Sequence, residues 1–366
     1  MSIATLNGQP IEFEAACREA AQRLRAARFP LVAGMGADVA GARAAILLAE
    51  RLRGAFDHLA SREILADLDV MRSFSMFTTT PNEARVRADC FLFVGPGLSK
   101  LWPDMIERLA PGAPPRHGSH AGAARRVFWL GPAAGEAADI AATVIPATLD
   151  ELPEALAILR ASAGGRPVAG DAARLGALAE AAAALKAVHF GVVVWSASTG
   201  IDPLAIEMLQ ALVADLNATT RCTGVPIGAR AGAAGVAQTA GWMTGFPPRT
   251  GFGHGYPEHD PWRFDAKRLV DSGETDLVMW ISAHDGEAPP WADGKVPTIT
   301  LAPAGKAPSS GLYFEVGRPG VDHDSVELSQ TIGGFAFTAA RAPSPTPGVA
   351  VVLDAIAKEL TGEVSC

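Results

Sequence analysis

The chain has 366 residues, of which 49% are hydrophobic and 19% are charged, so it can bury a sizeable core and is not disordered as a whole. Its 31 Lys and Arg residues and 39 Asp and Glu residues give a net charge of −8, which argues against a nucleic-acid partner because such surfaces are basic. The start, MSIATLNGQPIEF, lacks the features of a signal peptide, and no apolar run could span a bilayer. We therefore expect a cytoplasmic protein with no membrane partner.

The four cysteines are far apart and form no C-x-x-C pair. They are Cys17, Cys90, Cys222 and Cys366. A four-cysteine zinc or iron–sulfur site needs paired spacing, so we expect buried thiols in a reducing compartment.

In chain order, the first half alternates amphipathic helices with short apolar strands. Helices are predicted over 11–28, 41–54, 101–110 and 149–161, and strands over 29–35, 89–95 and 125–131. The stretch 164–171 is a glycine-rich break. After it, helices are predicted over 172–188, 202–217, 262–273 and 349–362, and strands over 189–197, 276–283 and 296–302. Asp202 as N-cap and Pro203 at the first helical position give one helix a clear start.

Strands made almost entirely of Val, Ile, Leu and Phe, separated by helices, predict an α/β fold with mostly parallel sheets covered by helices on both faces. The glycine-rich break is the expected domain boundary. We expect an N-terminal α/β lobe over 1–162 and a second α/β lobe over 163–366, whose C-terminal part could pack back on the first.

The segment AGMGADVAG (33–41) follows a predicted strand and opens a helix, as a dinucleotide-binding turn does. Its glycines Gly34, Gly36 and Gly41 have a spacing two residues too long for G-x-G-x-x-G. Asp38 would repel a pyrophosphate and suits a helix cap instead. We therefore expect a tight strand–helix turn without a nucleotide.

The histidine pairs are weak metal-site candidates. His117 and His120 lie in a loop with no Cys, Asp or Glu close by in sequence, which indicates a solvated loop. His254 and His259 have neighbouring carboxylates, but the Gly and Pro residues around them give no fixed face. The DHDS turn (322–325) is similarly weak, so we expect no metal ligand in this chain.

No nucleophile motif is present either. The chain has no G-x-S-x-G sequence, and Cys222 is a single thiol among apolar neighbours, which indicates a core position. WSASTG (195–200) ends a strand, where α/β proteins usually bind ligands, but its hydroxyls could equally cap the next helix. The residues alone therefore indicate no catalytic site.

The segment 241–261, GWMTGFPPRTGFGHGYPEHDP, has five glycines, four prolines and four aromatic residues. With its flanks (219–285) it resembles the B-type subunit of formylmethanofuran dehydrogenase. The matching motifs are W-x-TG-[YF]-P at 242–247, G-Y-P at 255–257, [GS]-E-x-D at 273–276, the R-A-D strand at 84–96 and the LYFEVGRPGVDHDS segment at 312–325. The likeness covers most of the chain, in order.

The resemblance implies a shortened molybdopterin-oxidoreductase-like (formate dehydrogenase-like) fold that lacks the iron–sulfur domain. The redox relatives carry an N-terminal cysteine cluster and a further cysteine for molybdenum or tungsten. Here only Cys17 precedes residue 90, and no cysteine lies between Leu59 and Val86. Small residues such as Gly232 replace polar cofactor contacts. We expect no molybdopterin, tungsten, molybdenum or iron–sulfur cluster in this subunit.

A B-type subunit without cofactors resembles the one in the formyltransferase/hydrolase complex of methylotrophic bacteria. The resemblance implies a non-catalytic structural subunit that works with an A-type hydrolase, a D-type formyltransferase and a C-type subunit. That complex takes the formyl group of formyl-tetrahydromethanopterin, through a methanofuran-type carrier, to formate during formaldehyde oxidation. Zinc is expected only in the partner hydrolase subunit.

Two other functions stay open. The chain could dock the polyglutamate part of the carrier through Arg221, Arg230 and Arg249, because guanidinium groups bind carboxylates in a bidentate way. It could also be an independent hydrolase that uses Cys222 or the His254 and His259 pair. The 241–261 loop itself is expected to be a rigid wall held by its aromatic residues Trp242, Phe246 and Tyr256.

Overall fold

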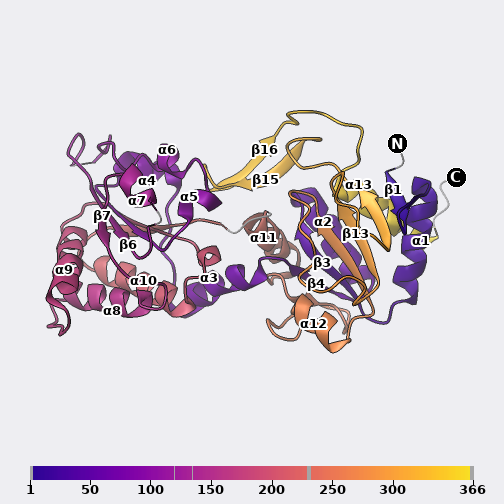
Figure 1. The fold of residues 1–366 in the computed structure, drawn as a ribbon, viewed down its shortest axis with the longest axis horizontal. Coiled ribbons are helices and arrows are strands. Elements are labelled where there is room, and N and C mark those ends of the chain that lie inside the picture. Colours follow the sequence, from indigo (N-terminus) through magenta and orange to yellow (C-terminus); the bar gives the residue numbers. More distant parts are fainter. Residues whose placement is uncertain (1–2, 119, 134, 229–231, 363–366) are drawn as a thin grey trace. The chain divides into compact units, whose positions relative to one another are not determined.

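A computed structural model describes residues 3–118, 120–133, 135–228 and 232–362. The chain forms two compact units (Figure 1). Unit 1 contains residues 3–61, 232–328 and 335–362, and unit 2 contains residues 62–228 and 329–334. This division differs from the expected lobes because the glycine-rich break at 164–171 joins two helices that pack on each other within unit 2.

Unit 1 is built on a nine-stranded sheet with the order β11-β10-β4-β3-β12-β13-β14-β1-β2. The five central strands are parallel, and the short strands at both edges are antiparallel. In chain order the strands are β1 (Ala4–Leu6), β2 (Gln9–Pro10), β3 (Pro30–Gly36), β4 (Ala55–His58), β10 (Thr250–Gly251), β11 (Glu258–His259), β12 (Leu277–Ser282), β13 (Thr298–Ala302) and β14 (Leu312–Glu315). Figure 1 shows the indigo β3 beside the orange strands, so early and late parts of the chain form one sheet.

Helices cover both faces of this sheet. They are α1 (Phe13–Ala26), α2 (Val39–Arg51), α11 (Ala233–Thr244), α12 (Ala266–Ser272) and α13 (Val349–Thr361). Alternate residues of a strand point to opposite faces, so Val32 packs with α1, α2 and α13. Met35 joins the same core because the positive φ angles of Gly34 (78°) and Met35 (54°) interrupt the alternation. Leu31 and Ala33 point the other way and pack with Leu269 of α12.

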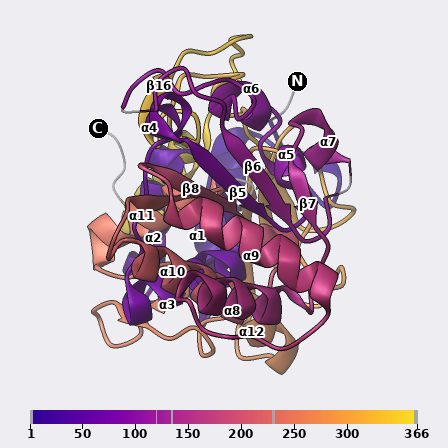
Figure 2. The ribbon, with the colours of Figure 1, turned by 90° about the vertical axis from the view of Figure 1, so that its left-hand side faces the viewer.

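Unit 2 has a fully parallel sheet with the order β7-β6-β5-β8-β9. Its strands are β5 (Cys90–Val94), β6 (Arg126–Leu130), β7 (Thr143–Ile145), β8 (Gly191–Trp195) and β9 (Cys222–Pro226). Its helices are α3 (Ser61–Phe74), α4 (Pro81–Arg87), α5 (Leu98–Leu101), α6 (Met105–Leu109), α7 (Glu136–Asp139), α8 (Leu152–Ala163), α9 (Ala172–Lys186), the short 3-10 helix η1 (Ala197–Thr199) and α10 (Pro203–Leu216). Figure 2 shows α8, α9 and α10 along one face of this sheet, and their apolar residues form one core with Leu92 and Val94. The expected α/β fold is confirmed.

A two-stranded hairpin, β15 (Ser325–Ser329) and β16 (Gly334–Thr338), completes the fold. Its tip belongs to unit 2, where the Gln330 amide nitrogen donates to the Pro226 carbonyl (3.0 Å) and its oxygen accepts from the Gly228 N–H (3.0 Å). The rest of the hairpin belongs to unit 1. None of the described helices is long and apolar enough to cross a membrane.

The predicted elements and the observed ones agree best where the local signal is strong. Helix α10 begins after Asp202, whose carboxylate accepts a hydrogen bond from the Leu204 N–H (2.8 Å), as predicted. The predicted helices do not include α3, α4 and α11. Helix α3 does have apolar residues at helical spacing, such as Ile64, Leu65 and Leu68, whereas α11 is rich in Gly, Ala and Thr, which give weak helical periodicity.

Candidate functional site: the Arg249 cluster and its loop

The 241–261 loop extends the main sheet of unit 1. Helix α11 ends at Thr244 and is followed by the cap residue Gly245, which has a φ of 80°. Strand β10 then pairs with β4 on one side and with β11 on the other, all antiparallel. A Cβ atom at Gly251 would lie 2.3 Å from the Phe264 ring, so only glycine lets this ring cover the backbone. The loop is therefore ordered by strand pairing and by close packing.

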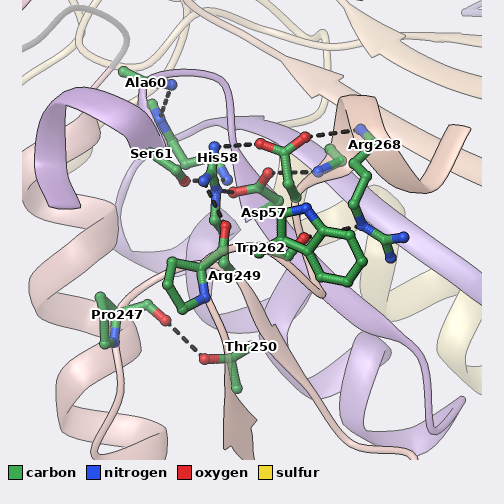
Figure 3. Close-up of polar contacts among 12 residues, drawn as sticks. Asp57, His58, Ala60, Ser61, Pro247, Arg249, Thr250, Trp262 and Arg268 are labelled. Carbon is green, nitrogen blue, oxygen red and sulfur yellow. Dashed lines mark hydrogen bonds and ion pairs between the residues drawn. The ribbon is translucent and has the colours of Figure 1, made fainter. Parts of the chain in front are cut away.

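Arg249 ties the loop to β4 and to α12 (Figure 3). Its side chain is only 16% exposed. The guanidinium donates to the Pro261 carbonyl (Nη1–O 2.6 Å), pairs with the Asp265 carboxylate through Nη2, and lies 3.7 Å from Asp57 Oδ1 through Nε. The residue itself has a φ of 67°, which non-glycine residues rarely adopt. The Arg249 charge is thus used inside the protein.

Asp57 is the buried carboxyl of this cluster, with 3% of the residue exposed. Its Oδ2 accepts a hydrogen bond from the Ala266 N–H (2.8 Å), whereas Oδ1 has no hydrogen-bond partner among the described residues. Burial raises the pKa of Asp57 from its ordinary 3.8 to about 7, although the Arg249 charge and hydrogen bonds from Ser61 and Ala266 act in the opposite direction. Asp57 therefore changes its charge near neutral pH.

His58 and Ser61 complete the turn from β4 into α3. His58 Nδ1 accepts a hydrogen bond from the Ala60 N–H (2.9 Å), which places the proton of the neutral ring on Nε2. Ser61 Oγ accepts from the His58 N–H (3.0 Å) and is 1% exposed. Both side chains are buried and hold the turn, so the serine hydroxyl is not a nucleophile that a substrate could reach.

The three arginines expected to contact a carrier have different positions. Arg221 is exposed and directly precedes β9 in unit 2, and its positive charge contributes to lowering the pKa of Glu83. Arg230 lies outside the described residues. Arg249 belongs to unit 1 and is occupied by Asp57 and Asp265.

The aromatic residues expected to hold the loop are largely exposed, which corrects part of the expectation from sequence, whereas the fourth loop aromatic, Phe252, is buried and packs on Phe56 of β4. Trp242 is 64% exposed, Phe246 is 38% exposed and Tyr256 is 58% exposed. Trp262, just after the loop, is 71% exposed, and the Arg268 guanidinium stacks on its ring at 4.4 Å (Figure 3). The Arg249 cluster, the backbone pairing and the buried Phe252 ring anchor the loop, while Trp242, Phe246 and Tyr256 are exposed and contact the rings of Phe335, His259 and His254.

Three of the histidine candidates contact protein groups. His120 Nδ1 lies 2.9 Å from the buried carboxylate of Asp89, which also accepts the His189 N–H (2.8 Å). The loop around His120 is thus attached at this histidine rather than wholly solvated, through a carboxylate that is distant in sequence. His254 Nδ1 contacts Glu258 Oε2 (2.6 Å), and His259 Nδ1 contacts the Arg249 carbonyl (3.0 Å).

The turn at 33–41 agrees with its prediction. Asp38 caps α2 by accepting a hydrogen bond from the Gly41 N–H (2.9 Å). Gly34 has a φ of 78°, and a Cβ atom there would lie 2.5 Å from the Ile281 carbonyl oxygen. The glycine serves strand packing, as expected for a tight turn.

The described cysteines do not fit a metal cluster. Cys17 lies on α1 in unit 1. Cys90 and Cys222 lie in unit 2 on β5 and β9, which are separated by β8, and both face Gly191 of β8 in the strand register. All three thiols are buried, and burial raises the pKa of each. Within residues 3–118, 120–133, 135–228 and 232–362, no group of three or more His, Cys, Asp or Glu side chains could hold a metal ion.

One cavity was not expected from the sequence. It has a volume of about 460 Å³ and lies at the carboxyl ends of β12, β13 and β14, where open α/β sheets bind ligands. Its charged lining includes Asp285, Lys306, Glu315 and the Arg318–Asp322 ion pair (3.1 Å). In the sequence, a charged residue lies at or after the end of each of these three strands. That pattern predicts a shared cavity only when the three strands are known to be neighbours in the sheet.

Comparison with known proteins gives consistent relatives, although no family model matches the chain. The B-type subunit of the formyltransferase/hydrolase complex Fhc of Methylorubrum extorquens is 34% identical over 350 residues, which is 94% of this chain and 93% of the relative. The B-type subunit of the tungsten-containing formylmethanofuran dehydrogenase 2 of Methanococcus maripaludis is 24% identical over 335 residues, which is 88% of this chain and 76% of the relative.

A solved structure agrees with the sequence relatives. The crystal structure of the formyltransferase/hydrolase complex FhcABCD from Methylorubrum extorquens with methylofuran contains a chain that is 33% identical, with a TM-score of 0.88. The alignment covers 98% of this chain and 99% of that chain. Sequence and fold thus agree over nearly the whole length, and the chain belongs to the family of B-type subunits of the formyltransferase/hydrolase complex.

Proposed function

We propose that this chain is a non-catalytic structural subunit of a formyltransferase/hydrolase complex that passes a formyl group from formyl-tetrahydromethanopterin, through a methanofuran-type carrier, to formate. Family membership over almost the full length supports the subunit role. The observation that carries the non-catalytic role is that the nucleophilic and charged side chains of the site are buried and used internally. Ser61 holds a turn, and Arg249 pairs with Asp57 and Asp265.

The donor groups of the chain also argue against the redox chemistry of the dehydrogenase relatives. An iron–sulfur cluster needs several thiolates around one centre. The three described cysteines lie on separate elements, and burial raises the pKa of each thiol, so the reactive thiolate form is disfavoured. The proposed role therefore has no redox step, and the zinc hydrolase and the formyltransferase are the partner subunits.

Purification with and without the partners tests this role. We expect the chain to co-purify with A-, C- and D-type subunits produced in the same cells. The isolated chain should contain no stoichiometric molybdenum, tungsten or iron by mass spectrometry, and it should not hydrolyse formyl-methanofuran. Stoichiometric metal in the isolated chain, or hydrolysis by it, would contradict the proposal.

Carrier docking is the second candidate function, and the exposed position of Arg221 favours it. Arg249 is occupied by two carboxylates, so the test uses Arg221 and Arg230. The double variant Arg221→Ala/Arg230→Ala should bind the carrier more weakly than wild type, whereas the exposed control Arg28→Ala should not. Equal carrier affinity in all three proteins would remove this function. Independent hydrolysis through Cys222 is disfavoured because that thiol is buried.

A further inference from the structure

An apolar stripe runs from helix α11 onto the β15–β16 hairpin. Gly235 and Trp242 are seven residues apart, about two helical turns, so they lie on the same face of α11. A Cβ atom at Gly235 would lie 3.5 Å from the Leu328 Cβ and 3.8 Å from a Phe335 ring atom. The Trp242 and Phe335 rings have centroids 4.8 Å apart. The hairpin therefore packs along this helix face.

The stripe continues outward on both hairpin strands. Val326 lies two residues before Leu328, and Phe337 lies two residues after Phe335, so each points to the same face as its neighbour. These outer positions are exposed: Trp242 by 64%, Val326 by 40% and Phe337 by 67%. We call Trp242, Val326 and Phe337 the hairpin stripe. All three residues belong to unit 1.

The hairpin also has an unprotected edge on β16. Among the named strands, β15 and β16 pair only with each other, so the outer edge of each lacks a strand partner. Proteins usually protect such edges with charges or proline, and β16, with the sequence GFAFT, has neither. An exposed apolar surface on an unprotected two-stranded ribbon is typical of a protein–protein contact.

We propose that the hairpin stripe is the docking surface for another subunit of the complex, which would present an apolar pocket for Trp242 and Phe337. This inference rests on the proposed subunit role. A similar chain occurs in a complex of four different subunits. The cores of protein–protein interfaces are enriched in aromatic residues such as Trp and Phe and depleted of charged residues. A second copy of this chain is a poorer occupant, because a net charge of −8 on each copy opposes self-association.

The test compares Trp242, which lies in the hairpin stripe, with Trp262, which is similarly exposed but lies outside it. The variant Trp242→Ser/Phe337→Ser removes the stripe, and the matched control Trp262→Ser removes an exposed tryptophan that stacks on Arg268. Each variant is produced together with the A-, C- and D-type subunits to test assembly. The same variant chain is also purified by itself, and its dissociation constant for the other subunits is measured. We expect a rise of at least about tenfold for the stripe variant and less than about threefold for the control. Circular dichroism and the urea midpoint check that the variants fold.

The outcomes separate this inference from the subunit role. If wild type does not assemble with the other subunits, the subunit role fails and the inference fails with it. If wild type assembles but the stripe variant binds as tightly, or the control loses as much, the inference is overturned while the subunit role stands. A wild-type homodimer that the stripe variant dissociates also overturns it. If the double variant does not fold, Phe337→Lys, which keeps the Trp242–Phe335 contact, must show the tenfold loss.

Discussion

Replacing Asp57 with asparagine should remove a pH dependence from the stability of unit 1. In the folded protein the Asp57 carboxyl keeps its proton up to about pH 7, whereas in the unfolded chain it loses the proton above its ordinary pKa of 3.8. The stability that this group contributes is fully present below pH 3.8 and is lost as the pH rises to 7. The loss is about 1.4 kcal/mol per pH unit and up to about 4 kcal/mol in total.

The variant Asp57→Asn stays neutral, and its side-chain oxygen can still accept the Ala266 N–H. Urea unfolding at pH 5, 6, 7 and 8 gives the free energy of unfolding of variant and wild type. Hydrogen exchange of the Ala266 amide reports the same change locally. We expect the variant to gain stability relative to wild type as the pH rises from 5 to 7, and no further gain above pH 7.

The control is Asp271→Asn, which removes an exposed carboxylate of α12 that an ion pair with Lys267 holds ionised. The hydrogen bond from Lys267 lowers the pKa of Asp271 on balance, so this variant should not gain stability as the pH rises from 5 to 8. If the difference between Asp57→Asn and wild type is constant with pH, or falls, then the Asp57 carboxyl is ionised in the folded protein and the reasoning from burial is wrong.

Two further predictions concern one ion-pair cluster and one packing contact. Arg249→Ala leaves Asp57 and Asp265 without their counter-charge, and we expect it to lower the free energy of unfolding by about 3 kcal/mol at pH 8. The exposed control Arg28→Ala should change it by less than about 1 kcal/mol. Equal effects of the two variants would contradict the anchoring role of Arg249. Gly34→Ala places a Cβ atom 2.5 Å from the Ile281 carbonyl oxygen, and we expect it to lower the free energy of unfolding by at least about 2 kcal/mol in the same assay. The control Gly8→Ala has a similar φ but open space around it, and should lower the free energy of unfolding by about 1 kcal/mol. If Gly34→Ala costs no more than Gly8→Ala, the steric argument is wrong.

Much of the fold could be predicted because its signals are local. The apolar runs at 89–95 and 189–197 correspond to β5 and β8, and the caps at Asp38 and Asp202 involve residues within a few positions of each carboxylate. Helix α11 was missed because its Gly, Ala and Thr residues give little periodicity, and it is stabilised by packing on α2.

The contacts of the candidate site could not be predicted because they join distant residues. Asp57 and Ala266 are 209 residues apart, and Asp89 and His189 are 100 residues apart. Which residues neighbour Asp57 depends on strands β4 and β10 lying side by side, and no local pattern contains that information.

The α/β class, the family resemblance and the lack of paired cysteines follow from the amino-acid sequence alone, because they depend on residue type and on spacing along the chain. The anchoring of the loop by Arg249 and the buried Phe252, with Trp242, Phe246 and Tyr256 exposed, emerges only in the folded chain. The reason is that burial is a property of packing. An aromatic side chain is buried or exposed according to which distant elements cover it, and its neighbours in sequence do not specify them.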